Sequence, residues 1–266
     1  MSYSTNEIAN IINATPINPI PAVIHYLLTD SRQIIQPETS LFFALGNHPL
    51  RNGHQFIASA YKLGVKNFVV AHKFNTADYP NANFFKVDNT LLALQQLAAF
   101  HRKKFHYPVI GITGSNGKTI VKEWLYQLLQ KEWNIVRSPR SYNSQIGVPL
   151  SVWHMGPQHQ IGIFEAGISM PGEMQHLQNI IAPTIGILTS IGDAHNEGFT
   201  SIQQKINEKL LLFKDVECLI YCVDDLPADT VLPEVSLFSW GSSSLANLQI
   251  LDYTFHTSKT EVNFHY

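Results

Sequence analysis

The chain has 266 residues, of which 45% are hydrophobic and 14% are charged, a composition typical of globular proteins and unlike that of disordered or fibrous chains. Its 18 basic and 20 acidic side chains give a formal net charge of −2. They form no basic stripe, which argues against nucleic acid as a partner. A chain of this length is expected to hold about two domains, each with its own core.

Nothing in the sequence indicates export or membrane insertion. Residues 1–12 alternate between polar and apolar types, without the basic start and apolar run of a signal peptide. The longest nearly apolar stretch, residues 180–191, is interrupted by Pro183 and is too short to span a bilayer. Cys218 and Cys222 lie in the run CLIYC, which predicts a buried strand with two reduced thiols. We therefore expect a cytoplasmic protein.

The first part of the chain alternates between strand and helix patterns. Short β-rich runs (LFFAL, KNFVVAH and NFFKVD) are separated by segments with helical spacing, such as residues 56–63. A helix is predicted over residues 90–104, and Pro108 then precedes the apolar run VIGIT. We therefore predict a first α/β domain over residues 1–107 and a second domain over residues 108–266.

The second part contains four continuous apolar runs, VIGIT, QIGIFEAG, PTIGILTSIG and ECLIYCVD. Such runs are typical of strands buried on both faces of a mostly parallel sheet flanked by helices. The predicted fold class is therefore α/β in both domains. Residues 247–266 are expected to form a hairpin-like pair of strands that ends abruptly.

The segment GITGSNGKT, residues 111–119, lies between a predicted strand and a predicted helix, as a phosphate-binding P-loop does. Gly114 and Gly117 allow a tight turn with inward N–H groups, and the helix N-terminus adds its positive dipole end. Lys118 would reach the β- and γ-phosphates of a nucleotide, and the Thr119 hydroxyl would bind magnesium. The alternative is a glycine turn before a helix with an exposed lysine. That helix is expected to pack on the sheet through Val121, Trp124, Leu125, Leu128 and Leu129.

The loop departs from the general P-loop signature, which requires glycine at the position of Ile112. Its narrower form, T-G-S-N-G-K-T, resembles the P-loop of the Mur ligases, which are ATP-dependent amide-bond-forming enzymes of bacterial cell-wall synthesis, and of their relative folylpolyglutamate synthase. Later segments resemble the same family in the same order: SYNSQIGVPLS, FEAGISMPGEM, TSIGDAHNEGF and KINEKLLLF. Near the N-terminus, LLTDSRQIIQPETSLFFAL and NGHQFIASAYKLGVKNFVV resemble the family's uridine-nucleotide domain.

The resemblance implies an ATP site and two magnesium ions in a P-loop ATPase-type second domain. The ATP-binding residues would be Thr113, Gly114, Ser115, Asn116, Gly117, Lys118 and Thr119. The metal ligands would be Thr119, Glu165, His195 and Lys209, and the catalytic side chains Lys118, His195 and Lys209. Lys209 has the position of a family lysine that carbon dioxide converts into a carboxylate-like carbamate, with Lys205 as the alternative candidate. Glu165 also ends a buried strand, where a carboxylate would face the phosphate site.

The resemblance also implies residues that bind the substrate. These would be Asp30, Ser31, Arg32, Gly53, His54 and Asn143. For Asp30 and Arg32, the alternative is a local ion pair at a strand end, which would contribute little stability if exposed. The segment around Asn143 is most similar to the family members that add D-alanyl-D-alanine, although Tyr142 replaces their first asparagine.

The family's reaction transfers the γ-phosphoryl group of ATP to a peptide carboxylate, and an amine then attacks the acyl phosphate. By resemblance, the carboxylate belongs to a UDP-N-acetylmuramoyl tripeptide and the amine to D-alanyl-D-alanine. The alternatives are a diamino-acid-adding ligase, folylpolyglutamate synthase, and a non-catalytic nucleotide-binding module. Because the family's third, C-terminal domain is absent from this sequence, we expect the chain alone to bind nucleotides weakly and not to complete the ligation.

Overall fold

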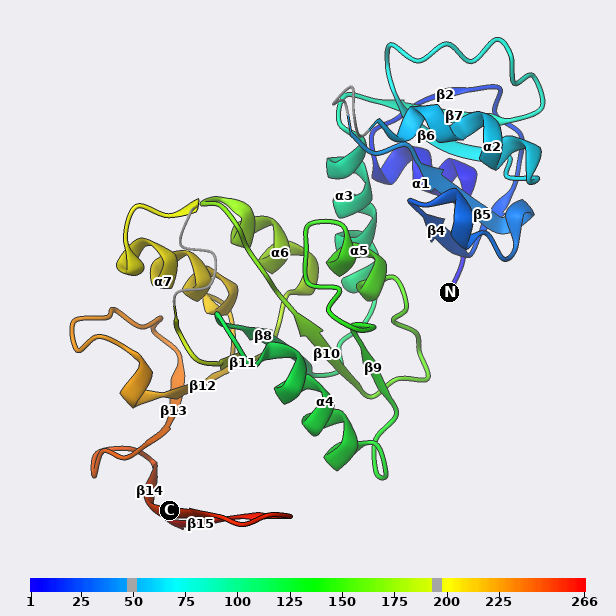
Figure 1. The fold of residues 1–266 in the computed structure, drawn as a ribbon. Coiled ribbons are helices and arrows are strands. Elements are labelled where there is room, and N and C mark those ends of the chain that lie inside the picture. The colour runs from blue at the N-terminus through cyan, green and yellow to red at the C-terminus, as the bar shows by residue number, and fades with distance from the viewer. Residues whose placement is uncertain (47–51, 193–197) are drawn as a thin grey trace. The chain divides into compact units, whose positions relative to one another are not determined.

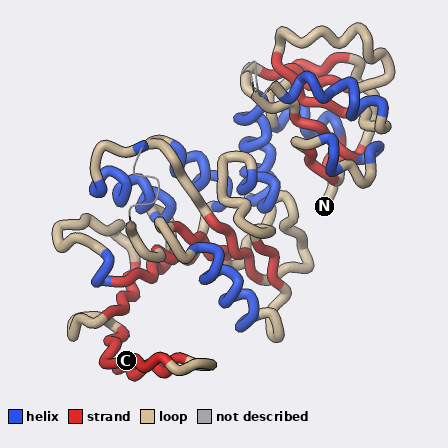
Figure 2. The backbone as a smooth tube through the Cα atoms, in the orientation of Figure 1, coloured by secondary structure: helices blue, strands red, loops and turns tan. Residues whose placement is uncertain are grey.

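Figure 1 shows the computed structural model of the chain, which describes residues 1–46, 52–192 and 198–266. The chain divides into two compact units, Met1–Lys104 and Phe105–Tyr266. Each unit is built around its own β-sheet with helices beside it, as the tube in Figure 2 shows. The predicted α/β fold class is therefore confirmed. Within the described part of the chain, no helix combines the length and apolar character needed to cross a bilayer.

The N-terminal unit contains a five-stranded sheet with the order β2-β7-β6-β5-β4. Neighbouring strands from β4 to β7 pair in parallel, and β2 is antiparallel. The strands of this sheet are β2 (Thr15–Ile17), β4 (Tyr26–Leu28), β5 (Ser40–Phe43), β6 (Asn67–Ala71) and β7 (Asn83–Val87). A separate antiparallel pair consists of β1 (Tyr3–Ser4) and β3 (Val23–Ile24). The helices are α1 (Thr5–Ile11), α2 (Ile57–Lys62), α3 (Thr90–Arg102) and the 3-10 turns η1 (Ser31–Gln33), η2 (Pro37–Thr39) and η3 (Gly53–Phe56).

Aromatic side chains form the core of this unit. Phe42, Phe68 and Phe84 are paired in register across β5, β6 and β7, so they lie on the same face of the sheet. All three are fully buried, and the ring centroids of neighbours are 6.1 and 5.3 Å apart. Ile57 and Ala60 of α2 pack against them. The burial of this face by α2 fixes the register of the parallel strands.

The C-terminal unit contains an eight-stranded sheet with the order β15-β14-β13-β12-β11-β8-β10-β9. All neighbours pair in parallel except β14 and β15, which form an antiparallel hairpin. The predicted parallel sheet and the predicted terminal hairpin are both confirmed. The strands are β8 (Val109–Thr113), β9 (Ile135–Arg137), β10 (Ile161–Glu165), β11 (Ile185–Leu188), β12 (Cys218–Cys222), β13 (Ser236–Gly241), β14 (Leu248–Phe255) and β15 (Thr260–His265). The helices are α4 (Lys118–Leu129), α5 (Gly147–Val152), α6 (Glu173–Ile181), α7 (Ile202–Leu210) and the 3-10 turns η5 (Leu211–Phe213) and η6 (Val223–Asp225).

The order of the central strands determines where loops meet. β8 is buried along its whole length and lies between β11 and β10, parallel to both. The carboxyl ends of three neighbouring parallel strands therefore lie at one edge of the sheet, the edge where α/β sheets bind ligands. The loop before α4, Glu165 at the end of β10, and Thr189 just after β11 all belong to this edge.

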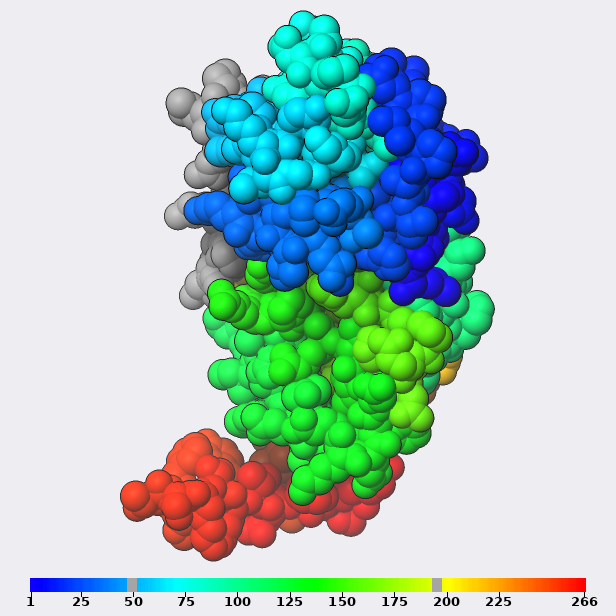
Figure 3. Space-filling view, turned by 90° about the vertical axis from the view of Figure 1, so that its right-hand side faces the viewer, coloured from blue at the N-terminus to red at the C-terminus, as the bar shows by residue number. Residues whose placement is uncertain are grey.

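One prediction about α4 is only partly correct. Val121 and Leu125 pack against the sheet cluster of Ile110, Ile112 and Ile163. Trp124 and Leu128, which were expected on that face, are 64% and 75% exposed. They lie next to the inner stripe on the helix surface, whereas Lys122, between Val121 and Leu125, is fully buried. The β14–β15 hairpin, red in Figure 3, also projects from the rest of its unit.

Candidate phosphate- and metal-binding site

The loop between β8 and α4 has the backbone shape of a phosphate cradle. Gly114 has a φ angle of +151° and Gly117 one of +84°, and L-residues with a side chain rarely adopt such values. Gly117 is also the N-cap of α4, so the first N–H groups of that helix, which lack intrahelical partners, follow the turn directly. A helix N-terminus after a glycine turn is a site suited to an anion.

The segment after β11 holds this loop in place. The Thr189 hydroxyl lies 2.6 Å from the carbonyl of Asn116, to which it donates. The Ser115 amide donates to the Ser190 carbonyl at 2.8 Å, and the Ser115 hydroxyl donates to the Gly192 carbonyl at 3.0 Å. Several polar groups of the loop are therefore satisfied by one neighbouring segment, which stabilises the turn without a ligand.

Lys118 is folded back over its own loop. Its ammonium group donates to the carbonyls of Gly114 at 2.8 Å and Ser115 at 3.3 Å. Burial lowers the pKa of Lys118, Glu165 raises it, and the nearby charge of Lys205 lowers it further. The amine therefore lies beside the cradle, and its hydrogen-bond partners among the described residues are neutral carbonyls that a phosphate oxygen could replace.

Thr119 and Glu165 form the part of the site suited to a hard cation. Glu165 is fully buried at the end of β10, and its Oε2 atom accepts a hydrogen bond from the Thr119 hydroxyl at 3.0 Å. A hydroxyl and a carboxylate at the entrance of a phosphate cradle are oxygen ligands of the kind magnesium prefers. The donor set therefore fits a magnesium ion bound together with nucleotide phosphates.

Two further buried lysines lie nearby, one on this loop and one on the segment after β11 that holds it. Lys209 donates to the Gly114 carbonyl at 3.1 Å, and Lys205 donates to the carbonyl of Gly192. Burial, reinforced by the charges of Lys118 and Lys205, lowers the pKa of Lys209 to about 7. A large share of this amine is therefore neutral near neutral pH, which is the form that reacts with carbon dioxide.

The structure brings together most of the side chains predicted for this site. Lys118, Thr119, Glu165 and Lys209 all contact the loop or each other. The remaining predicted ligand, His195, belongs to residues 193–197, which lie outside the described residues. Asn143 lies in the same unit, and its carbonyl accepts a hydrogen bond from the Gly167 amide at 2.8 Å, two residues after Glu165. Its role in binding a substrate stays a prediction.

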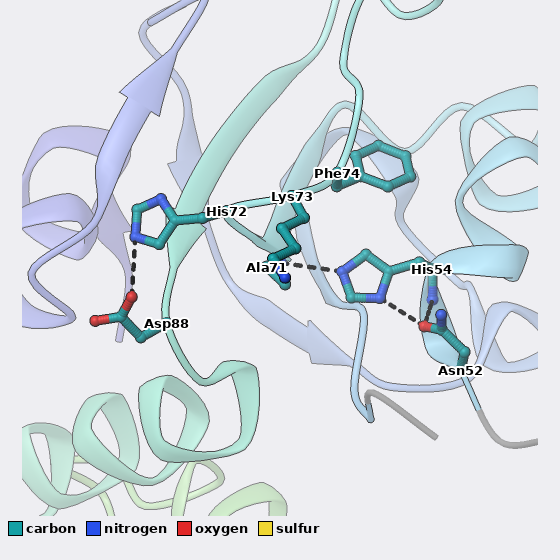
Figure 4. Close-up of a pocket in the computed structure, with 7 residues that line it drawn as sticks. All are labelled: Asn52, His54, Ala71, His72, Lys73, Phe74 and Asp88. Carbon is teal, nitrogen blue, oxygen red and sulfur yellow. Dashed lines mark hydrogen bonds and ion pairs between the residues drawn. The ribbon is translucent and has the colours of Figure 1, made fainter. Parts of the chain in front are cut away.

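The N-terminal unit has a pocket of its own, shown in Figure 4. It has a volume of about 570 Å³ and lies beside the end of β6. The lining residues are Asn52, His54, Ala71, His72, Lys73, Phe74 and Asp88. One of the predicted substrate-binding residues, His54, therefore lines a cavity large enough for part of a small molecule.

His54 uses both of its ring nitrogens inside the protein (Figure 4). The Nε2 atom accepts the Ala71 amide at 3.0 Å, and the Nδ1 atom lies 2.6 Å from the Asn52 side-chain oxygen. Since Nε2 is an acceptor, the proton must reside on Nδ1, which donates to Asn52. Burial lowers the pKa of His54, in agreement with a neutral ring. The imidazole thus ties the start of η3 to the end of β6.

Replacing His54 with alanine should therefore loosen the end of β6. We expect a loss of about 1–2 kcal/mol of local stability, because the Ala71 amide would lose its partner. Hydrogen–deuterium exchange at the Ala71 amide measures this directly. His72→Ala is the matched control in the same pocket, since the ion pair of His72 with Asp88 is exposed and should contribute little. Equal protection of Ala71 in the His54→Ala variant and the parent chain would contradict this role.

The other predicted substrate residues of this unit have local contacts. Arg32 donates to both carboxylate oxygens of Asp30, at 2.6–3.1 Å, and its side chain is 88% exposed. These hydrogen bonds lower the pKa of Asp30. The local ion pair, considered above as an alternative, is therefore present. Ser31 lies 3.5 Å from the hydroxyl of Ser59, and Gly53 contacts the backbone of Leu45 too closely for any Cβ atom.

Comparison with known proteins agrees with this architecture. Residues 112–266, which include the phosphate cradle and Glu165, match the Mur ligase middle domain. The chain belongs to the Mur ligase family. Among curated relatives of this Mur ligase, the UDP-N-acetylmuramoyl-tripeptide–D-alanyl-D-alanine ligase of Borreliella burgdorferi is 33% identical, over 94% of this chain and 56% of that protein. The enzyme of the same name from Bacillus subtilis is 32% identical, over 84% of this chain and 49% of that protein. The chain spans about half the length of these relatives.

Solved Mur ligase structures have the same fold. MurF from Acinetobacter baumannii superimposes with a TM-score of 0.88 at 21% identity, covering 100% of this chain and 58% of that one. MurF from Thermotoga maritima, solved in complex with ADP, superimposes with a TM-score of 0.78 at 25% identity, covering 90% of this chain and 55% of that one. The similarity of this Mur ligase chain to the solved structures therefore covers both of its units.

Two residues at the site of this Mur ligase were not predicted from the sequence. Thr189 holds the loop through its hydroxyl, and Lys122 is a fully buried lysine beside Glu165. Thr189 follows a predicted strand at the edge of the sheet, so its position in the sequence was a usable signal. Lys122 had no such signal, because a lysine on a helix is normally exposed.

Proposed function

We propose that this chain provides the nucleotide-binding part of an ATP-dependent ligase that adds D-alanyl-D-alanine to UDP-N-acetylmuramoyl tripeptide during peptidoglycan synthesis. The observation that supports this most strongly is the convergence of Lys118, Thr119, Glu165 and Lys209 on one glycine turn. The curated relatives with about one-third identity, which are UDP-N-acetylmuramoyl-tripeptide–D-alanyl-D-alanine ligases, support the choice of substrates. Such a reaction uses nucleotide substrates, and we place it in the cytoplasm.

In this proposal the glycine turn binds the triphosphate of ATP through its backbone N–H groups. Lys118 exchanges its two carbonyl partners for phosphate oxygens, where its positive charge offsets the charge on the transferring group. Thr119 and Glu165 would hold one magnesium ion, and His195 with a carbamylated Lys209 would hold a second. Magnesium held by these residues would supply positive charge that offsets the repulsion between the phosphates and the peptide carboxylate.

The N-terminal unit would bind the uridine end of the peptide substrate. The pocket beside β6 and the Asp30–Arg32 pair both belong to this unit. We infer that Asp30, Ser31, Arg32, Gly53 and His54 act in this recognition partly by shaping the backbone, since His54 has no free ring nitrogen in the structure. In the C-terminal unit, Asn143 would contact the peptide part.

Carbamylation of Lys209 is expected to depend on pH. Carbon dioxide reacts with the neutral amine, and a pKa of about 7 means that the neutral fraction rises through neutral pH. An ordinary lysine, with a pKa of about 10.4, would remain almost fully charged there. Protein equilibrated with 13C-bicarbonate should show a carbamate carbon signal by NMR that grows between about pH 6 and about pH 8.

This carbamate signal should disappear in the variant Lys209→Met. Lys205→Met is the control, because Lys205 is buried near the same loop and is the alternative site. Loss of the signal in Lys205→Met alone would assign the modification to Lys205. Its absence from the parent chain at every pH would contradict carbamylation.

The proposed activity is tested by ATP-dependent phosphate release. The assay contains UDP-N-acetylmuramoyl tripeptide and D-alanyl-D-alanine. Parallel reactions pair each alternative amine with its own acceptor, a diamino acid with the UDP-N-acetylmuramoyl dipeptide and glutamate with a folate. It is carried out with the 266-residue chain and with any longer natural polypeptide that contains it. We expect release with D-alanyl-D-alanine only, and only from a polypeptide that also contains the family's C-terminal domain. Release with a diamino acid would indicate the diamino-acid-adding type, and ATP binding without release in any form would indicate a non-catalytic nucleotide-binding module.

A further inference from the structure

Lys122 is a buried cation that the proposed reaction does not use directly. It lies on α4 one turn after Lys118 and Thr119, and its side chain is fully buried. Its ammonium group donates to the carbonyl of Ser138 at 2.8 Å and to that of Arg140. A lysine is rarely buried unless each of its protons has a partner. These two carbonyls satisfy two of its three protons.

The remaining contacts of Lys122 are with carboxylates. Its Nζ atom lies 2.9 Å from Glu165 Oε1 and 3.2 Å from Glu123 Oε1. Glu165 Oε1 has no other polar partner among the described residues, and the contact with Lys122 is an ion pair without hydrogen-bond alignment. Because Glu165 is fully buried, Lys122 supplies the opposite charge that offsets the cost of removing this carboxylate from water.

The two oxygens of Glu165 therefore have different roles. Oε1 is held by Lys122, and Oε2 accepts the Thr119 hydroxyl at 3.0 Å. The Glu165 amide also donates to the Ser138 hydroxyl at 3.3 Å, so the residue is anchored through its backbone as well. The carboxylate is thereby oriented towards α4, with Oε1 beside the Lys122 ammonium group and Oε2 beside the Thr119 hydroxyl.

Lys122 fixes a second element next to the same point. The carbonyls of Ser138 and Arg140 belong to the loop after β9, and Arg140 has a left-handed φ angle of 49°. That loop leads to Ser141, whose hydroxyl lies 3.4 Å from the Thr119 hydroxyl. One ammonium group thus joins α4, the end of β10 and the loop after β9 around Thr119 and Glu165.

We propose that Lys122 is a positioning residue for the magnesium ion, because it restrains Glu165 Oε1 and the loop after β9 so that Glu165 Oε2 and the Thr119 hydroxyl face the metal together. This inference rests on the proposed function, in which Thr119 and Glu165 hold magnesium. Lys122 would thus act on the metal site indirectly, through its contacts with other protein groups.

The test measures how strongly magnesium enhances ATP binding. Isothermal titration calorimetry gives the Kd of ATP for the 266-residue chain with Mg²⁺ and with EDTA, and the ratio of the two values is the enhancement. In Lys122→Met, a neutral side chain of similar length, we expect the enhancement to fall at least fivefold while the Kd in EDTA changes less than threefold. A purely structural role would change both Kd values alike.

Two further variants make the outcome decisive. Lys122→Arg keeps the charge, so the chain should fold even if Lys122→Met does not. Its planar guanidinium has a different donor geometry and should still lower the enhancement at least fivefold. Glu123→Gln is the matched control, because it removes the neighbouring acid, leaves the contact with Glu165 in place, and should keep the enhancement within twofold of the parent value.

The possible results separate this inference from the proposed function. Parent-like enhancement in either folded Lys122 variant would overturn the positioning role and leave the magnesium site intact. An equal loss of the magnesium enhancement in Glu123→Gln would also overturn the positioning role. The effect would then come from the net charge of α4 and not from the contact between Lys122 and Glu165. No magnesium enhancement in the parent chain would overturn the proposed function and this inference together.

Discussion

Replacing Lys118 with alanine should weaken the binding of ATP in the presence of magnesium by about 100-fold, or ~2.7 kcal/mol. Lys118 is the cation of the glycine turn. Its ammonium group donates to two carbonyls of that turn, those of Gly114 and Ser115. Its contacts with phosphate oxygens would be charge-assisted, and therefore stronger than the hydrogen bonds that they replace. Titration calorimetry with Mg²⁺ and ATP measures the change.

The control for this substitution is Lys131→Ala, which removes an exposed lysine just after the end of the same helix. It should leave the Kd of ATP within about twofold of the parent value, because exposed charges at a distance are screened by salt. Unchanged ATP binding in Lys118→Ala would mean that the turn does not hold the triphosphate. The proposed function would then lose its main support.

Replacing Gly114 with alanine should destabilise the C-terminal unit by about 3 kcal/mol and abolish ATP binding. Two causes combine at this position. The φ angle of +151° is unfavourable for a residue with a side chain, and a Cβ atom would overlap the Thr189 hydroxyl. The hydroxyl cannot easily rotate away, because it donates to the Asn116 carbonyl at 2.6 Å. Thermal unfolding and ATP titration measure the two effects.

Gly172→Ala separates these two causes. Gly172 also has a left-handed φ angle, of +85°, but an added Cβ atom would meet nothing within 4 Å. This variant should lose only about 1 kcal/mol, the cost of the backbone conformation alone. If both variants lose the same stability, the contact between Gly114 and Thr189 is not what requires glycine in the turn.

The backbone elements that carry this site can be predicted well from the sequence. The position of the turn, the parallel strands beside it and the strand-end position of Glu165 follow from apolar runs and glycine spacing, which are local properties. The inner face of α4 was predicted less well. Val121 and Leu125 face the sheet as expected, whereas Trp124 and Leu128 are exposed. Periodicity defines a stripe about half a helix wide but does not say which edge of it the sheet covers.

The contacts that complete the site could not be predicted, because they join distant segments. Lys122 is buried by the carbonyls of Ser138 and Arg140, which lie on a loop whose path depends on the tertiary fold. For His54 the substrate-binding role stays a prediction, and the hydrogen bond that its imidazole accepts from the backbone of β6 could not be foreseen. No local pattern distinguishes a histidine that binds a ligand from one that pairs with an amide.

The cluster of Lys118, Lys205 and Lys209 has a further consequence. Each of the pKa values of Lys118 and Lys209 is depressed partly by a neighbouring cation, so these lysines repel one another beside the glycine turn. Folding must hold these positive charges close together, and the binding of a polyanion would relieve the repulsion between them. Part of the conformational stability would thus be given up for affinity, and the nucleotide of the proposed function would act as the counter-ion of this lysine cluster.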